Sequence, residues 1–216
     1  MAIADIARPC AGFESPNERK ACWKIQMQAA DLRLNSTYRW LRKRLPAAEK
    51  QELKKDSRAW IHYKTFQCGF EAEMQHKTLK DPRDTETFFS CIHGYTVSRE
   101  QYLRQAFGYE GVSKSTVDGE YRDTFGGTLS LQTRNGALHF QLNVVRGPTH
   151  HTGEIKGVLQ RNGDVGSFST KDEMSPPQMC QIQASFRPFR ISLKATNCSY
   201  FHGARAYFDG LYRKVK

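Results

Sequence analysis

The chain has 216 residues, of which 25% are charged and 38% are hydrophobic. This composition is typical of an ordered protein with one large or two small domains. No apolar run approaches the ~20 residues of a membrane-spanning helix. The N-terminus lacks both the basic and the apolar region of a signal peptide, so we expect either a cytosolic protein or a mature form whose signal peptide has been removed.

The formal net charge is +11, and the excess is spread over both halves of the chain. Such a charge predicts attraction to an acidic partner. No base-reading motif accompanies it, so we expect no nucleic-acid partner.

Six cysteines distinguish between the two compartments. They form no CxxC pair and no zinc-ligand spacing, which favours disulfides over a metal site. Disulfides persist in oxidising compartments, so we expect a periplasmic or secreted protein with the signal peptide removed. The expected disulfide cysteines are Cys10, Cys22, Cys68, Cys91, Cys180 and Cys198.

The first half predicts helices. Ser15-Pro16 is a typical helix start, and Pro46 predicts a turn between two antiparallel helices. We expect the second of these helices to end near Cys68. The apolar spacing predicts two stripes on the first helix. The stripes comprise Cys22, Ile25, Ala29 and Leu32 on one side, and Leu34, Tyr38, Leu41 and Leu45 on the other.

A third helix is expected after the hairpin. We expect it to start near Thr96 or Ser98 and to end at Gly108.

The helical hairpin also suggests a disulfide pairing. Cys22 and Cys68 lie at similar distances from Pro46 along the chain, so an antiparallel pair of helices would place them at the same height. This predicts Cys22–Cys68 and, by elimination, Cys10–Cys91.

The second half predicts strands. Residues 138–144 alternate between apolar and polar, and Asn135-Gly136 is a strong hairpin signal. Six to eight strands of this kind, the last over 205–208, predict an antiparallel β barrel or sandwich and an α+β protein overall. Cys180 and Cys198 bracket two adjacent strands, which predicts a bond between them. We expect a helical domain over 10–110 and a β domain over 117–216.

Several motifs together resemble the LprI-type lysozyme-inhibitor family over about residues 10–107. They are Cys10…Glu18…Cys22, Asp31-x-x-Leu34-Asn35-x-x-Tyr38, Leu53…Trp60-Ile61…Cys68 and Cys91…Thr96-x-x-Arg99…Leu103. The resemblance implies an exported, non-catalytic bacterial protein with a small cysteine-containing helical domain. Some family members are described as lysozyme inhibitors. This sequence departs from the family at Asp56-Ser57-Arg58-Ala59-Trp60, where an Ala-Gln-Arg-x-Trp run is more usual.

The motif residues predict a structural role rather than catalysis. Asp31 and Asn35 share a helix face, and Arg58 or Arg99 could bind them and hold the third helix against the hairpin. No His, Ser or second carboxylate recurs near Asp31 at catalytic spacing, so we expect no catalytic residue, metal or cofactor. The predicted structural set is Asp31, Leu34, Asn35, Tyr38, Trp60 and Arg99.

The turn of the hairpin is strongly basic. Its functional interpretation is a docking surface for an acidic protein, an anionic lipid or nucleic acid, and its ordinary interpretation is a solvated helix face. Nucleic acid is the weakest of the three, because an oxidising compartment holds little of it. The predicted partner-binding residues are Arg39, Trp40, Arg42, Lys43 and Arg44.

These observations favour a non-enzymatic protein that binds and inhibits another protein, as the family resemblance implies. Two alternatives stay open. One is a periplasmic immunity protein that neutralises an acidic antibacterial toxin, because common animal-type lysozymes are basic and would be repelled by this chain. The other is an envelope ligand-binding protein that uses the interior of the β domain.

Overall fold

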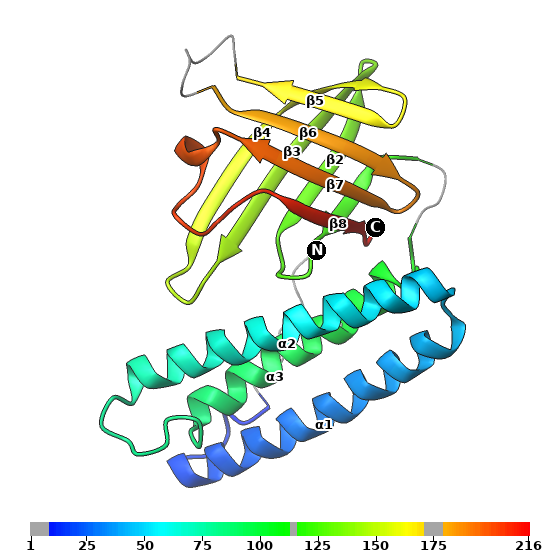
Figure 1. Cartoon of the computed structure of the whole chain (residues 1–216). Helices are drawn as coiled ribbons and strands as arrows, with labels where there is room; N and C mark the ends of the chain where they lie inside the picture. The colour runs from blue at the N-terminus through cyan, green and yellow to red at the C-terminus, as the bar shows by residue number, and fades with distance from the viewer. Residues whose placement is uncertain (1–8, 113–115, 171–178) are drawn as a thin grey trace. The chain divides into compact units, whose positions relative to one another are not determined.

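A computed structural model describes residues 9–112, 116–170 and 179–216. The chain divides into two compact units, Met1–Leu103 and Arg104–Lys216. The first is helical and the second is a closed antiparallel β barrel (Figure 1). The predicted α+β class, with helices first and strands second, is confirmed.

The helical unit is built on two helices of equal length. α1 (Pro16–Arg44) and α2 (Ala47–Gln75) each have 29 residues, and only Leu45 and Pro46 separate them. Proline disfavours helical geometry in the preceding residue, so α1 stops at Arg44 and the chain reverses at once. α3 (Glu86–Ala106) then lies along the hairpin (Figure 1).

One of the two predicted apolar stripes on α1 is buried. Leu34 and Leu41 lie in the core together with Leu45 at the turn. In the other stripe, Ile25 and Leu32 are 63% and 69% exposed, whereas Cys22 and Ala29 are partly buried. Apolar spacing therefore identified the helix correctly, but it did not identify which of the apolar residues form the core.

The predicted start of α3 was wrong by about ten residues. The hydroxyl of Thr85 accepts a hydrogen bond from the backbone N–H of Phe88 at 3.3 Å, which is the geometry of a helix N-cap. The helix begins at Glu86 and continues through Gly94 without interruption. The cap at Thr85 was the sequence signal that could have located this start.

The predicted pairing of the first four cysteines was also wrong. The bonds are Cys10–Cys22 and Cys68–Cys91. Height along a helix does not determine the direction in which a side chain points. Cys68 is fully buried and bonds to α3, whereas Cys22 on α1 bonds to the segment that precedes it. Since Cys91 lies in α3, counting from the α2–α3 connection would have paired it with Cys68.

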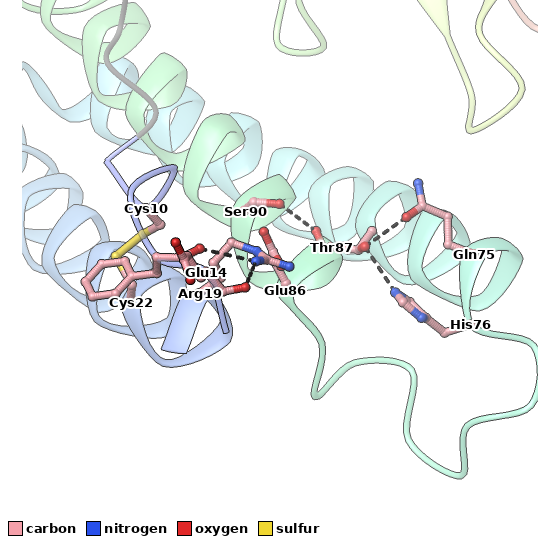
Figure 2. Close-up of polar contacts among 10 residues, drawn as sticks. Cys10, Glu14, Arg19, Cys22, Gln75, His76, Glu86, Thr87 and Ser90 are labelled. Carbon is pink, nitrogen blue, oxygen red and sulfur yellow. Dashed lines mark hydrogen bonds and ion pairs between the residues drawn. A yellow bond between two sulfur atoms is a disulfide. The ribbon is translucent and has the colours of Figure 1, made fainter. Parts of the chain in front are cut away.

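Polar contacts close the open end of the hairpin (Figure 2). The Nε of Arg19 on α1 donates to the Glu86 carboxylate on α3 at 3.0 Å. The hydroxyl of Thr87 on α3 lies 2.9 Å from Oε1 of Gln75 and 3.1 Å from Nε2 of His76. The first turn of α3 is therefore attached to both other helices.

The second unit is an eight-stranded meander. Each strand pairs with the next one in sequence, and β1 pairs with β8 to close the barrel. The strands are β1 (Gly119–Arg122), β2 (Thr128–Arg134), β3 (Ala137–Arg146), β4 (His151–Asn162), β5 (Val165–Ser169), β6 (Gln181–Arg187), β7 (Arg190–Thr196) and β8 (Gly210–Lys214).

Several strand predictions are confirmed. Asn135 and Gly136 both have positive φ and form the two-residue turn between β2 and β3. Cys180 and Cys198 are bonded across the start of β6 and the end of β7. The predicted last strand over 205–208 was wrong, since β8 begins only at Gly210. Phe208 is nevertheless fully buried and belongs to the barrel core.

A buried ion pair lies near the turn between β1 and β2. The guanidinium of Arg146 on β3 pairs with Asp123, whose other carboxylate oxygen accepts the backbone N–H groups of Phe125 and Gly127 at 2.9 and 2.8 Å. Burial raises the pKa of Asp123, while Arg146 and the two N–H groups lower it. The pair fixes the turn because each charge satisfies the other inside the protein.

We predict that the Cys68→Ser/Cys91→Ser variant destabilises the helical unit by roughly 3 kcal/mol, because it frees a loop of 23 residues in the unfolded state. All three tryptophans lie within residues 1–103, so tryptophan fluorescence during urea unfolding reports on this unit alone. The matched Cys180→Ser/Cys198→Ser variant should leave that fluorescence transition unchanged. An equal shift in both variants would contradict the assignment of this stabilisation to the Cys68–Cys91 bond.

Candidate protein-binding surface

The last turn and a half of α1 carries a cluster of basic residues around an exposed tryptophan. We call this cluster the basic tip, and it comprises Arg39, Trp40, Arg42, Lys43 and Arg44. Trp40 is 37% exposed, and the guanidinium carbon of Arg44 lies 4.6 Å from the centre of its ring. The two residues are four apart, so they lie on the same helix face. The basic tip borders an open hollow of about 570 Å³, to which Ser36 and Tyr38 also contribute.

The four cations of the basic tip form no ion pair with any described residue. None of them takes part in the salt bridges of the helical unit, and no acidic residue occurs between Asp31 and Glu49. Arg39 and Lys43 are four residues apart, and like charges at this spacing repel each other mildly. The negative end of the helix dipole offsets part of this repulsion. The basic tip therefore keeps its positive charge available for a partner.

Buried leucines hold the basic tip in place. Leu41 is 1% exposed and Leu45 is 8% exposed, and both belong to the core. Leu53, on the first turns of α2, is fully buried as well. The charged residues thus project from a backbone that is anchored on its inner side, which limits the conformational entropy lost when a partner binds.

The predicted polar motif occupies two separate places. Asn35 donates its amide to the Asp31 carboxylate at 2.8 Å, and both residues are exposed on α1. Arg99 does not bind them. Its guanidinium instead pairs with Asp56 on α2, so the predicted partner of Arg99 was wrong. Arg58, the other predicted partner, is exposed.

Arg99 is the central polar residue of the helical core. It is 3% exposed, and its guanidinium carbon lies 5.3 Å from the ring centre of Trp60 and 4.9 Å from that of Tyr102. Asp56 and Ser57, where the sequence departs from the family motif, both contact this guanidinium. The residues that differ from the family motif are therefore the ones on α2 that bind Arg99 of α3. The charge of Asp56 was the sequence signal that could have identified the partner.

A second hollow, of about 560 Å³, lies among the three helices. Asp31 and the exposed Leu32 border it on α1, and Lys64 borders it on α2. Burial lowers the pKa of Lys64, and the nearby Asp31 carboxylate opposes this effect. The predicted motif residue Asp31 therefore lies on the surface of this hollow, but its negative charge balances the positive charge of Lys64. The hollow offers a partner less electrostatic attraction than the basic tip does.

Among the described residues, no group of three or more His, Cys, Asp or Glu side chains is arranged to hold a metal ion. No helix in the described part of the chain has the length and apolar composition to cross a membrane.

One comparison with known proteins finds a match to the helical region. Residues 10–103 match the model of the family described as Lysozyme inhibitor LprI. The matched range contains the first two disulfides, the basic tip and Arg99. No curated protein and no solved structure matches the chain. The predicted family resemblance over the helical region is confirmed, and a β domain follows it.

We predict that Arg99→Met destabilises the helical unit by about 3–5 kcal/mol, because it leaves the Asp56 carboxylate buried without its countercharge. The matched control is Lys20→Met, which removes a more exposed pair with Asp84 and should cost less than about 1 kcal/mol. Urea unfolding followed by tryptophan fluorescence measures both. Equal costs would contradict the central role of Arg99.

Proposed function

We propose that this chain, whose residues 10–103 match the LprI family of lysozyme inhibitors, is an exported, non-enzymatic protein that binds and inhibits a lysozyme-type hydrolase. The family match supports a protein partner of this kind. The basic tip is the surface that we assign to the contact. The observation that carries the assignment is the group of four cations around the exposed Trp40, none of which forms an ion pair with a described residue.

The chemistry of lysozyme-type enzymes supports the assignment. Glycoside hydrolases generally place two carboxyl groups on either side of the bond that they cleave. Arginine side chains bind carboxylates through paired hydrogen bonds, and tryptophan is enriched among the residues that dominate binding energy. The basic tip combines both residue types. Arg39 or Arg42 would pair with the carboxylates of the target, and Trp40 would cover the apolar wall of its substrate cleft.

The net charge narrows the choice of target. At +11 the chain would be repelled at long range by a basic lysozyme and attracted by an acidic one. We therefore propose a target of low isoelectric point. The same charge supports the alternative function, an immunity protein that neutralises an acidic antibacterial toxin. Both functions would use the basic tip, and they differ only in the enzyme that is bound.

The cysteines support export. All six are disulfide-bonded, and such bonds persist outside the reducing cytosol. Two of the bonds lie in the helical unit, where they limit the flexibility of the helices that carry the basic tip. Binding by a fixed surface loses little ordering entropy, which suits an inhibitor that acts by steric cover.

We predict that the purified chain slows the clearing of a peptidoglycan suspension by an acidic lysozyme-type hydrolase more than by a basic one. Charge reversal by Arg42→Glu/Lys43→Glu should raise the inhibition constant at least tenfold, because it replaces attraction by repulsion. Trp40→Ala should raise it by a similar factor.

The matched control is Lys77→Glu/Lys80→Glu, which changes the net charge equally at exposed positions between α2 and α3. It should change inhibition less than threefold. Failure to inhibit either hydrolase at micromolar excess would overturn the proposed function. Equal effects of the two charge reversals would overturn the role of the basic tip.

A further inference from the structure

One end of the barrel holds a hollow of about 270 Å³ within the second unit. Strands β1, β4, β6, β7 and β8 all contribute to it, so it lies at a mouth of the barrel rather than on its side. An engineered cavity of roughly 150 Å³ binds benzene in another protein, whereas drug-sized ligands occupy about 300–1,000 Å³. The hollow therefore has room for one small molecule.

Its inner wall is apolar and aromatic. Tyr121, Phe186 and Ile191 border it, and each is at most 5% exposed and belongs to the barrel core. The hairpin between β6 and β7 adds Phe189, which has a positive φ of 60°. A bulky residue rarely adopts this conformation. The backbone N–H of Lys214 binds the Phe189 carbonyl at 2.8 Å and helps to hold it there.

Lys214 brings a positive charge into the barrel. It lies directly opposite Tyr121 across the β1–β8 pair, so both side chains share the inner face. The residue is 1% exposed, and its ammonium donates to the Thr116 carbonyl at 2.6 Å. Burial lowers the pKa of this ammonium, and the Asp118 carboxylate opposes the effect. One hydrogen bond to a carbonyl offsets only part of the free energy that the ammonium loses when it leaves water.

Arg161 adds a second positive charge at the rim. It continues the inward-facing series of Ile155 and Leu159 on β4, and its guanidinium carbon lies 4.8 Å from the ring centre of Phe186. Its Nε donates to the Gly163 carbonyl at 2.9 Å. No acidic side chain among the described residues forms an ion pair with Arg161. The N–H groups of its two terminal nitrogens donate to no described residue, so they can donate to a ligand.

Two acidic side chains lie around the hollow. Asp164 borders it and pairs with Arg187 at 3.4 Å, so these two charges balance. Asp118 lies near Lys214, and its two oxygens accept the backbone N–H and hydroxyl of Thr133 at 3.0 and 2.7 Å. These neutral donors leave the Asp118 charge in place, and it offsets one of the two cations. Lys214 and Arg161 together still leave a net positive charge beside the aromatic wall.

We propose that this barrel mouth binds a small organic acid with a flat apolar body. The carboxylate would lie between Arg161 and Lys214, and the body would pack against Tyr121, Phe186 and Ile191. Arginine offers paired N–H donors that match the two oxygens of a carboxylate, and lysine adds a point charge. This site is independent of the basic tip, and its test requires no hydrolase.

The test titrates the whole chain with benzoate, with its neutral analogue benzamide and with inorganic phosphate, and follows the ring resonances of Tyr121 and Phe186 by NMR. We expect benzoate to shift these resonances in a saturable way, and benzamide and phosphate to bind at least tenfold more weakly. Equal binding of benzamide would overturn the role of the cations. Equal binding of phosphate would overturn the role of the aromatic wall.

Two variants check the assignment of the cations. Arg161→Gln lies at the exposed rim and should weaken benzoate binding about tenfold, since a charge-assisted hydrogen bond is lost. Lys214→Met should weaken it at least as much, provided that circular dichroism shows a folded barrel. The matched control Lys156→Gln removes a charge from the exposed outer face of β4 and should leave binding unchanged. Unchanged affinity in Arg161→Gln would overturn the proposal whether or not Lys214→Met folds.

Discussion

The attachment of α3 to α2 is the constraint on which the helical unit depends. A hairpin of two 29-residue helices buries too little surface on its own, because small domains have a high ratio of surface to core. The Cys68–Cys91 bond joins α3 to the buried side of α2 near one end. Further along α3, the buried pair of Arg99 and Asp56 joins the same two helices. A covalent and an electrostatic contact thus define both the position and the rotation of α3.

The same constraint explains which parts of the helical unit could be predicted from sequence. Pro46 located the reversal of the hairpin because its effect is local. The disulfide pairing and the partner of Arg99 were predicted wrongly, because both depend on the rotation of α3 about its axis, which counting residues from Pro46 does not reveal. Apolar spacing was ambiguous on α1, where Ile25 and Leu32 of the second stripe are exposed. The start of α3 was missed although Thr85 carries a local signal for it.

The barrel was more predictable because strand periodicity relates directly to burial. Leu138, Phe140, Leu142 and Val144 alternate in sequence, and all four lie in the core. The Asn135-Gly136 turn set the register of its hairpin, and the Cys180–Cys198 bond followed from the adjacent strands that it joins. Closure of the barrel through β1 and β8 joins residues far apart in sequence, which alternation alone does not reveal. The inward position of Lys214 follows from that closure and was therefore missed as well.

The two candidate sites present positive charge in different ways. In the basic tip, the charge is exposed, is anchored by buried leucines and suits a large acidic surface. At the barrel mouth, Lys214 is buried beside the Tyr121 ring, which suits a small anion.

Hydrogen exchange in the presence of an acidic lysozyme-type hydrolase tests the central claim most directly. Backbone amides near the end of α1, over residues 36–45, should exchange more slowly in the complex because the enzyme covers the basic tip. Helix amides distant from the tip, such as those near Gly94 on α3, should exchange at unchanged rates. Protection confined to the barrel strands, with the end of α1 unaffected, would contradict the assignment of the basic tip as the inhibitory surface.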